Sequence, residues 1–202
     1  MSKKERNEQS QAPQQEESAQ KAALRKIWDS TNYIIVPVVV MFLLLGVIFS
    51  LAWVPSGSME PTLPTKSYFL GWRLPYFFAD PTPARGDIIM FRSDEMDELM
   101  VKRVIGLPGD TITLKDGYVY VNGEVLEEDY LPVQGITYVT GESDYFEVPE
   151  GCVFVMGDNR TGSFDSRAWL NPYIPVEKIR SKALVDVAFL PDCTWKGVRL
   201  LN

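Results

Sequence analysis

The feature that most constrains the fold is an uncharged apolar run near the start of the chain. Residues 33–54 read YIIVPVVVMFLLLGVIFSLAWV and contain no charged side chain. As an α-helix rising ~1.5 Å per residue, such a run extends about 33 Å and matches the roughly 30 Å apolar core of a bilayer. The run therefore predicts a membrane-spanning helix. Tyr33 and Trp53 stand at its two ends, where interfacial aromatic residues are common.

A cleaved secretory signal is the alternative interpretation of this run. Its apolar part would be only ~7–15 residues long and would be followed by a small-x-small cleavage site. The run here is longer, and Trp53-Val54-Pro55 is a poor cleavage site, so we expect an uncleaved anchor. Basic residues precede the run and an acidic surface follows it, which predicts residues 1–32 in the cytoplasm and residues 55–202 outside.

The chain on either side of the run has two different characters. Residues 1–20 are polar and rich in Gln, Glu and Ser, without an apolar period, which predicts a disordered tail. The roughly 150 residues after the run suffice for one domain with its own core. Their pattern is mainly β, with tight turns at Asp116-Gly117 and Asn122-Gly123. The expected strands are 87–91, 99–105, a meander over 110–126, 145–148, 152–156 and 181–190.

Two further features leave alternatives open. Residues 68–78 contain six aromatic residues in eleven positions. They serve either core packing or a surface that dips into the membrane beside the anchor. Cys152 and Cys193 are the only cysteines, too few for a structural zinc site. They form either one disulfide, if the domain lies outside the cytosol, or two buried thiols.

Composition excludes several classes of chemistry. The chain has no histidine, which rules out Ser-His-Asp and Cys-His catalysis and His-ligated metal sites. An activated nucleophile must instead use Lys, Asp, Glu, Tyr or an amine as its base. Residues 55–202 carry 14 Lys and Arg against 22 Asp and Glu, which argues against nucleic acid as the main partner.

A rigid serine turn and a lysine in apolar surroundings are the candidate reactive groups. Residues 55–63 read PSGSMEPTL, so two serines separated by a glycine are fenced by prolines directly after the apolar run. A serine nucleophile needs a base, and a lysine amine is neutral near pH 7 only when it is desolvated or beside another cation. Lys102 fits best, because Met100 and Val104 share its strand face. A lysine on an exposed strand face is the alternative interpretation.

A third cluster, GDNRTGSFDSR at residues 157–167, consists mostly of turn formers. Taken alone it predicts a structural loop, pinned by the Asp165 and Arg167 pair. The three clusters together, in this order and after a membrane span, resemble the motifs of bacterial type I signal peptidases. PSGSMEPTL is similar to the nucleophile motif of that family, VKRVIGLPGD at 101–110 to its lysine motif, and GDNRTGSFDSR to its last box. ARGDIIMF at 84–91 resembles the strand box between the first two.

The resemblance implies a role for each matching residue. Ser58 would be the acylating nucleophile and Lys102 the general base of a Ser–Lys dyad. Ser56 would add its hydroxyl to the Ser58 N–H in the oxyanion hole. The remaining implied roles are orientation of the lysine amine by Ser163, a supporting ion pair of Asp165 with Arg167, and small substrate pockets lined by Val54, Met59, Leu63 and Val101.

The resemblance also implies the fold and the activity. We expect a mainly β protein with a single N-terminal transmembrane helix and a signal-peptidase-type catalytic domain carrying a small β insertion at about residues 111–150. Such an enzyme removes signal peptides with small residues at −1 and −3 from exported preproteins. It would be a monomer in the bacterial cytoplasmic membrane, in contact with lipid, and would need no metal or nucleotide. The rival interpretations are another Ser–Lys peptidase, such as a self-cleaving repressor, and a membrane-anchored β domain that only binds partners.

Overall fold

The computed structural model describes residues 21, 25, 26, 28, 31–78, 82–189 and 195–201. The expected disordered tail at residues 1–20 and the second cysteine, Cys193, lie outside the described residues. The chain divides into two compact units, residues 1–46 and residues 47–202, and each is described by itself.

The first unit contains a helix that runs from Thr31 into the start of the second unit, at Ile48, and its side chains are not buried. Among the described residues it is the one helix that is long and apolar enough to cross a membrane. It ends six residues before the expected boundary at Val54, because the last part of the apolar run forms strand β1, Phe49–Trp53. Every residue of this strand pairs with a residue of the antiparallel strand β2, Tyr68–Trp72.

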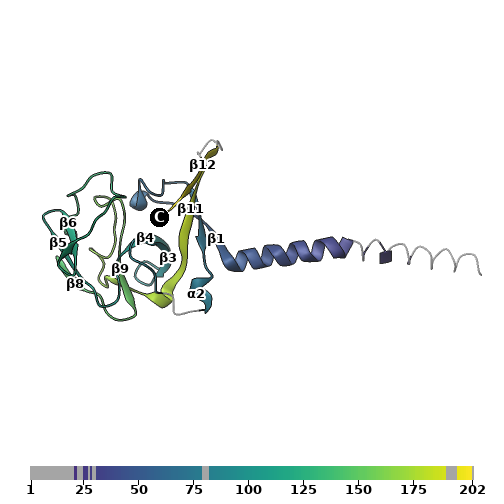
Figure 1. The fold of residues 1–202 in the computed structure, drawn as a ribbon, viewed down its shortest axis with the longest axis horizontal. Coiled ribbons are helices and arrows are strands. Elements are labelled where there is room, and N and C mark those ends of the chain that lie inside the picture. Colours follow the sequence, from purple (N-terminus) through teal and green to yellow (C-terminus); the bar gives the residue numbers. More distant parts are fainter. Residues whose placement is uncertain are drawn as a thin grey trace, which may run out of the picture. The chain divides into compact units, whose positions relative to one another are not determined.

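The second unit is built on an eight-stranded antiparallel sheet with the order β1-β2-β11-β3-β4-β9-β10. Strand β12 lies off this path and pairs with β11 (Figure 1). The mainly β fold expected from the sequence is therefore confirmed. The remaining strands of this sheet are β3 Ile88–Ser93, β4 Glu98–Gly106, β9 Cys152–Met156, β10 Tyr173–Pro175, β11 Ile179–Phe189 and β12 Trp195–Leu200.

A smaller antiparallel sheet has the order β7-β6-β5-β8 and falls within the residues expected for the β insertion. Positive φ angles at Asp116, Gly117, Asn122 and Gly123 make the two tight turns that the sequence predicts. The strands are β5 Thr111–Lys115, β6 Tyr118–Val121, β7 Glu124–Val125 and β8 Tyr145–Glu147. Within the described part of this unit, three short helices complete the fold, namely η1 Gly57–Met59, α2 Pro75–Phe78 and η2 Val176–Lys178.

The aromatic segment at 68–78 divides between the two environments that the sequence left open. Phe69 is fully buried, in one cluster with Val54, Met59 and Leu63. Tyr68 and Trp72 lie on the opposite face of β2 and are exposed. The alternation follows from the two-residue period of a strand. Core packing and an exposed aromatic face are thus both present in this segment.

Candidate active site

The serine turn and the lysine strand meet in one groove of about 540 Å³. One wall is β1 with the turn that follows it, and the other wall is the first half of β4. Ser58, in η1, and Lys102, in β4, both line this groove, although 43 residues separate them in the chain. Ser56 lines it as well, and its Oγ lies 3.4 Å from Ser58 Oγ.

The 157–167 loop holds the serine turn from behind. The Ser58 carbonyl accepts a hydrogen bond from the Asn159 N–H at 3.1 Å, and Asn159 Nδ2 donates to the Gly57 carbonyl at 3.0 Å. Gly157 permits an unusually close approach, because a Cβ there would lie 2.4 Å from the Ser58 carbonyl oxygen and 2.2 Å from Ser163 Oγ. The structure thus brings the third sequence cluster directly against the first.

Lys102 is only 2% exposed, which excludes the interpretation of an exposed strand lysine. Burial lowers the pKa of its amine from 10.5 to about 8. The carboxylates of Asp165, Asp158 and Glu98 act in the opposite direction, and the Arg167 guanidinium adds to the lowering. The chain therefore holds a lysine that is partly neutral near pH 7 and faces the groove that contains Ser58.

Ser163 is buried at the centre of this arrangement. Its hydroxyl lies close enough to Asp165 to contribute to the low pKa of that carboxyl. It nevertheless makes no hydrogen bond of normal geometry with any described residue. A buried hydroxyl without a partner is costly and therefore rare in folded proteins.

Asp165 and Arg167 form a fully buried ion pair that shapes the loop. Arg167 donates from Nε to Asp165 Oδ1 at 2.8 Å and from Nη2 to Oδ2 at 2.9 Å. Burial by itself would raise the pKa of Asp165, but the bonds from Arg167 and from the Gly157 N–H, 2.9 Å from Oδ2, lower it. Asp165 is therefore a stable carboxylate that fixes both the loop and the Gly157 backbone.

Three of the four expected pocket residues, Val54, Met59 and Val101, line the groove. Leu63 does not line it and is instead fully buried, in the same cluster as Val54 and Met59. Sequence reasoning missed the other apolar lining residues on β1, β3 and β4, because half of them lie on β1, which the apolar run predicted as the end of the membrane helix. These are Leu51, Ala52, Trp53, Met90, Leu99 and Met100.

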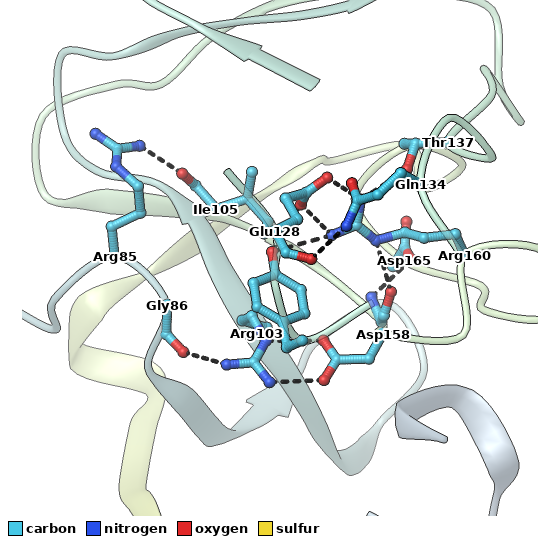
Figure 2. A network of polar contacts seen from close by, with 12 residues as sticks. Arg85, Gly86, Arg103, Ile105, Glu128, Gln134, Thr137, Asp158, Arg160 and Asp165 are labelled. Carbon is cyan, nitrogen blue, oxygen red and sulfur yellow. Dashed lines mark hydrogen bonds and ion pairs between the residues drawn. The ribbon is translucent and has the colours of Figure 1, made fainter. Parts of the chain in front are cut away.

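Sequence reasoning also missed a buried polar network behind the lysine strand (Figure 2). Arg103 pairs with Asp158 through two bonds of 2.8 and 2.7 Å, and Arg160 pairs with Glu128. The sequence predicts no role for Asp158 or Arg160 beyond their place in the 157–167 loop. Glu128 comes from a segment without a motif, so no sequence signal could have found it.

In the described part of the chain, no group of three or more acidic, cysteine or histidine side chains is arranged to hold a metal ion.

Known proteins are similar in sequence to most of this chain. The family model described as "Signal peptidase, peptidase S26" matches residues 27–188. A probable signal peptidase I-2 of Synechocystis sp. is 36% identical over 66% of this chain and 60% of its own length. A signal peptidase I of Bacillus licheniformis is 34% identical over 82% of this chain and 89% of its own length. The chain thus spans well under the full length of the first relative and most of the second.

A solved structure is also similar. The crystal structure of a signal peptidase I from Enterococcus faecalis is 35% identical in sequence and covers 50% of this chain and 95% of its own, with a TM-score of 0.42. The match of the family model over most of the chain, together with the Bacillus relative, shows the family. The chain belongs to the signal peptidases of family S26, which are hydrolases.

Proposed function

We propose that this protein is a membrane-bound serine endopeptidase that removes N-terminal signal peptides from exported preproteins, with Ser58 as nucleophile and Lys102 as general base. The observation that carries the proposal is one groove lined by both residues, in which burial lowers the pKa of the lysine to about 8. With that pKa roughly a tenth of the amine is neutral at pH 7, against ~0.03% for an ordinary lysine.

The chemistry proceeds in two balanced steps. Lys102 Nζ takes the Ser58 proton while Ser58 Oγ attacks the scissile carbonyl carbon. Collapse of the tetrahedral intermediate breaks the peptide bond, and the protonated lysine gives its proton to the leaving amine of the mature protein. Lys102 then takes a proton from water as the water oxygen attacks the acyl carbonyl, and it gives this proton to Ser58 Oγ as the ester bond breaks, which releases the signal peptide with a new C-terminal carboxyl group. In both steps Lys102 Nζ takes the proton of the attacking group and gives it to the group that departs.

The other residues of the turn and loop support these steps. The Ser56 hydroxyl and the Ser58 backbone N–H donate to the oxyanion that forms in the attack. Ser163, whose buried hydroxyl has no hydrogen bond of normal geometry among the described residues, is available to orient the Lys102 amine. The ion pair of Asp165 with Arg167 fixes the loop that carries Ser163.

The groove favours an extended peptide with small side chains at −1 and −3. Among the described strands, residues 98–102 of β4 pair with β3 only, because the pairing with β9 begins at Arg103. Strand β1 likewise pairs only with β2 among the described strands. Each wall therefore offers backbone groups to a peptide in strand conformation. Val54, Met59 and Val101 narrow the groove, with Leu63 packed beneath them, so larger substrate side chains would clash.

The apolar helix fits an anchor in the bacterial cytoplasmic membrane, with the N-terminus inside and the catalytic domain outside as one monomer. Eighteen helical residues extend ~27 Å, close to the apolar thickness of a bilayer. Leu51 and Trp53 on β1 are 67% and 53% exposed, and they share a face with Tyr68 and Trp72 on β2. An apolar face of this kind suits contact with lipid rather than water.

A cleavage assay tests the proposal. Detergent-solubilised full-length protein is incubated with a precursor that carries Ala at −1 and −3, and the new N-terminus is identified by mass spectrometry. Wild type should cleave once, at the end of the signal peptide, whereas Ser58→Ala and Lys102→Ala should be inert. An inactive wild type would favour the binding-only domain. A Lys102→Ala variant with near-normal turnover would overturn the mechanism.

A further inference from the structure

A long irregular segment packs behind the serine–lysine groove. Residues 126–144 connect β7 to β8 without a strand or helix of their own. They nevertheless place the polar side chains of Glu128 and Thr137 in the interior, where these are 4% and 2% exposed. Buried polar groups in an irregular connection are costly unless they are satisfied, so their partners show what the segment does.

The partner of both side chains is Arg160, which lies in the 157–167 loop and is 1% exposed. Its Nη2 and Nη1 donate to the two Glu128 carboxylate oxygens at 2.5 and 3.1 Å, and Nη1 also donates to Thr137 Oγ1 at 2.7 Å. Figure 2 shows Glu128, Thr137 and Arg160 converging in this way. The guanidinium is thus held by a bidentate pair and a hydroxyl at once.

Arg160, held in this way, also binds the backbone behind the groove. Its Nε donates to the Gly157 carbonyl at 3.0 Å. Gly157 is the residue that packs against both the Ser58 carbonyl and the Ser163 side chain, and its lack of a Cβ is what lets them approach. A shift of the Gly157 carbonyl would therefore move the nucleophile and the buried serine together.

A second route leads from Glu128 to the lysine strand. Tyr130 donates its hydroxyl proton to Glu128 Oε1 at 2.7 Å, and its ring lies 3.9 Å below the guanidinium of Arg103. Burial, reinforced by Glu128, raises the pKa of Tyr130, so the hydroxyl remains a donor at every physiological pH. Arg103 is the neighbour of Lys102 on β4. Glu128 is therefore linked through Arg160 to the backbone behind Ser58, and through Tyr130 to the residue that follows Lys102 on β4.

We propose that Glu128 is a positioning residue, which fixes Arg160 and through it the Gly157 backbone that sets the places of Ser58 and Ser163. The proposal rests on the proposed function, because it concerns the geometry of that reaction. Stability alone is a weak reason for a buried ion pair, since its desolvation can offset its attraction. If the pair positions the site, its loss should lower the catalytic rate in addition to any effect on stability.

The charges around the lysine define a readout that a merely structural role would not move. The charged side chains that act on the Lys102 pKa are Asp165, Arg167, Asp158 and Glu98. Arg103 with Asp158, Arg160 with Glu128 and Arg167 with Asp165 form three balanced pairs behind it. Removing the Glu128 charge leaves one uncompensated cation in this region, which disfavours a protonated lysine. The rise of kcat with pH should then begin at lower pH.

The test compares Glu128→Gln with Glu127→Gln, whose carboxylate is exposed and adjacent in sequence. Both variants are full-length and detergent-solubilised, and cleavage of the Ala −1, Ala −3 precursor is followed at a temperature where each is fully folded. Glu128→Gln should lower the plateau kcat at least tenfold, change KM less than threefold and shift the acid limb to lower pH. Glu127→Gln should match wild type. A Glu128→Gln variant with kcat and pH profile equal to wild type overturns the proposal.

Glu128→Gln alone leaves the buried Arg160 guanidinium without its carboxylate partner, which destabilises the fold. A double variant therefore separates an effect on positioning from an effect on folding. Glu128→Gln with Arg160→Met removes both charges and should recover thermal stability relative to the single variant. Its kcat should stay low, since the Gly157 carbonyl has lost the Arg160 Nε donor. Recovery of kcat together with stability overturns the proposal. An inactive wild type overturns the proposed function itself, whereas an active wild type with an unaffected Glu128→Gln variant overturns only the Glu128 role.

Discussion

The pH dependence of cleavage follows from the burial of Lys102. A general base must be neutral, so kcat/KM should rise with pH and level off above the lysine pKa of about 8. The neutral fraction for that pKa is ~1% at pH 6, ~10% at pH 7 and ~90% at pH 9. The rate should therefore rise about tenfold between pH 6 and pH 7, but by less than ~1.3-fold between pH 9 and pH 10.

A lysine with the ordinary pKa of 10.5 would give a clearly different curve. Its neutral fraction still rises about eightfold between pH 9 and pH 10. The two cases therefore differ most in alkaline solution, where the buried lysine has already reached its plateau. The position of the plateau measures the net effect of burial and of the neighbouring charges on the lysine pKa.

The assay is initial-rate cleavage by the detergent-solubilised full-length protein, from pH 6 to pH 10 at constant ionic strength. The precursor should carry no titratable side chain near its cleavage site, so that only the enzyme contributes to the profile. Continued steep rise from pH 9 to pH 10 would refute the claim that burial depresses the lysine pKa. A rate that does not change from neutral pH to pH 10 would refute the lysine base altogether.

Three further variants probe the same groove. Lys102→Met should abolish cleavage. It should also raise the free energy of unfolding at pH 7 by up to ~3 kcal/mol in denaturant melts, because folding lowers the lysine pKa from 10.5 to about 8. This gain should vanish above pH ~10.5, where the lysine is neutral in both the folded and the unfolded state. Glu98→Gln should move the acid limb slightly to lower pH, since this carboxylate raises the lysine pKa; an upward shift would contradict that. Gly157→Ala should lower kcat at least tenfold, because the new Cβ would lie 2.2 Å from Ser163 Oγ. The control Gly46→Ala should leave kcat unchanged, because a Cβ there meets nothing within 4 Å.

The parts of the fold that could be predicted are those fixed by local chemistry. The Asp116-Gly117 and Asn122-Gly123 turns adopt the positive φ angles that their sequences favour. The apolar neighbours of Lys102 raised the hypothesis of a desolvated amine beside the alternative of an exposed one; the structure buries the lysine, on a strand that places Ile89 opposite it. In each case the signal lies within a few residues of the feature. Local periodicity is therefore sufficient to find them.

The parts that could not be predicted depend on distant partners. The apolar run changes from helix to strand at Phe49, and periodicity cannot show this because both conformations tolerate a continuous apolar sequence. What decides is the pairing with β2, which lies after the serine turn. The contact of Glu128 with Arg160 is likewise invisible in sequence, because it joins an irregular segment to a loop 32 residues away.

The register of β4 explains how one strand supplies both a lysine amine with a lowered pKa and a buried guanidinium that pairs with a carboxylate. Side chains alternate across a strand, so Lys102 faces the groove while Arg103 points to Asp158 and Tyr130. A slip of one residue would exchange the two. An amine beside the Asp158 carboxylate would be held protonated and could not serve as a base. The pairings of Lys102 with Ile89 and of Arg103 with Met156 fix this register from both sides, so the basicity of the site depends on sheet pairing as much as on the lysine itself.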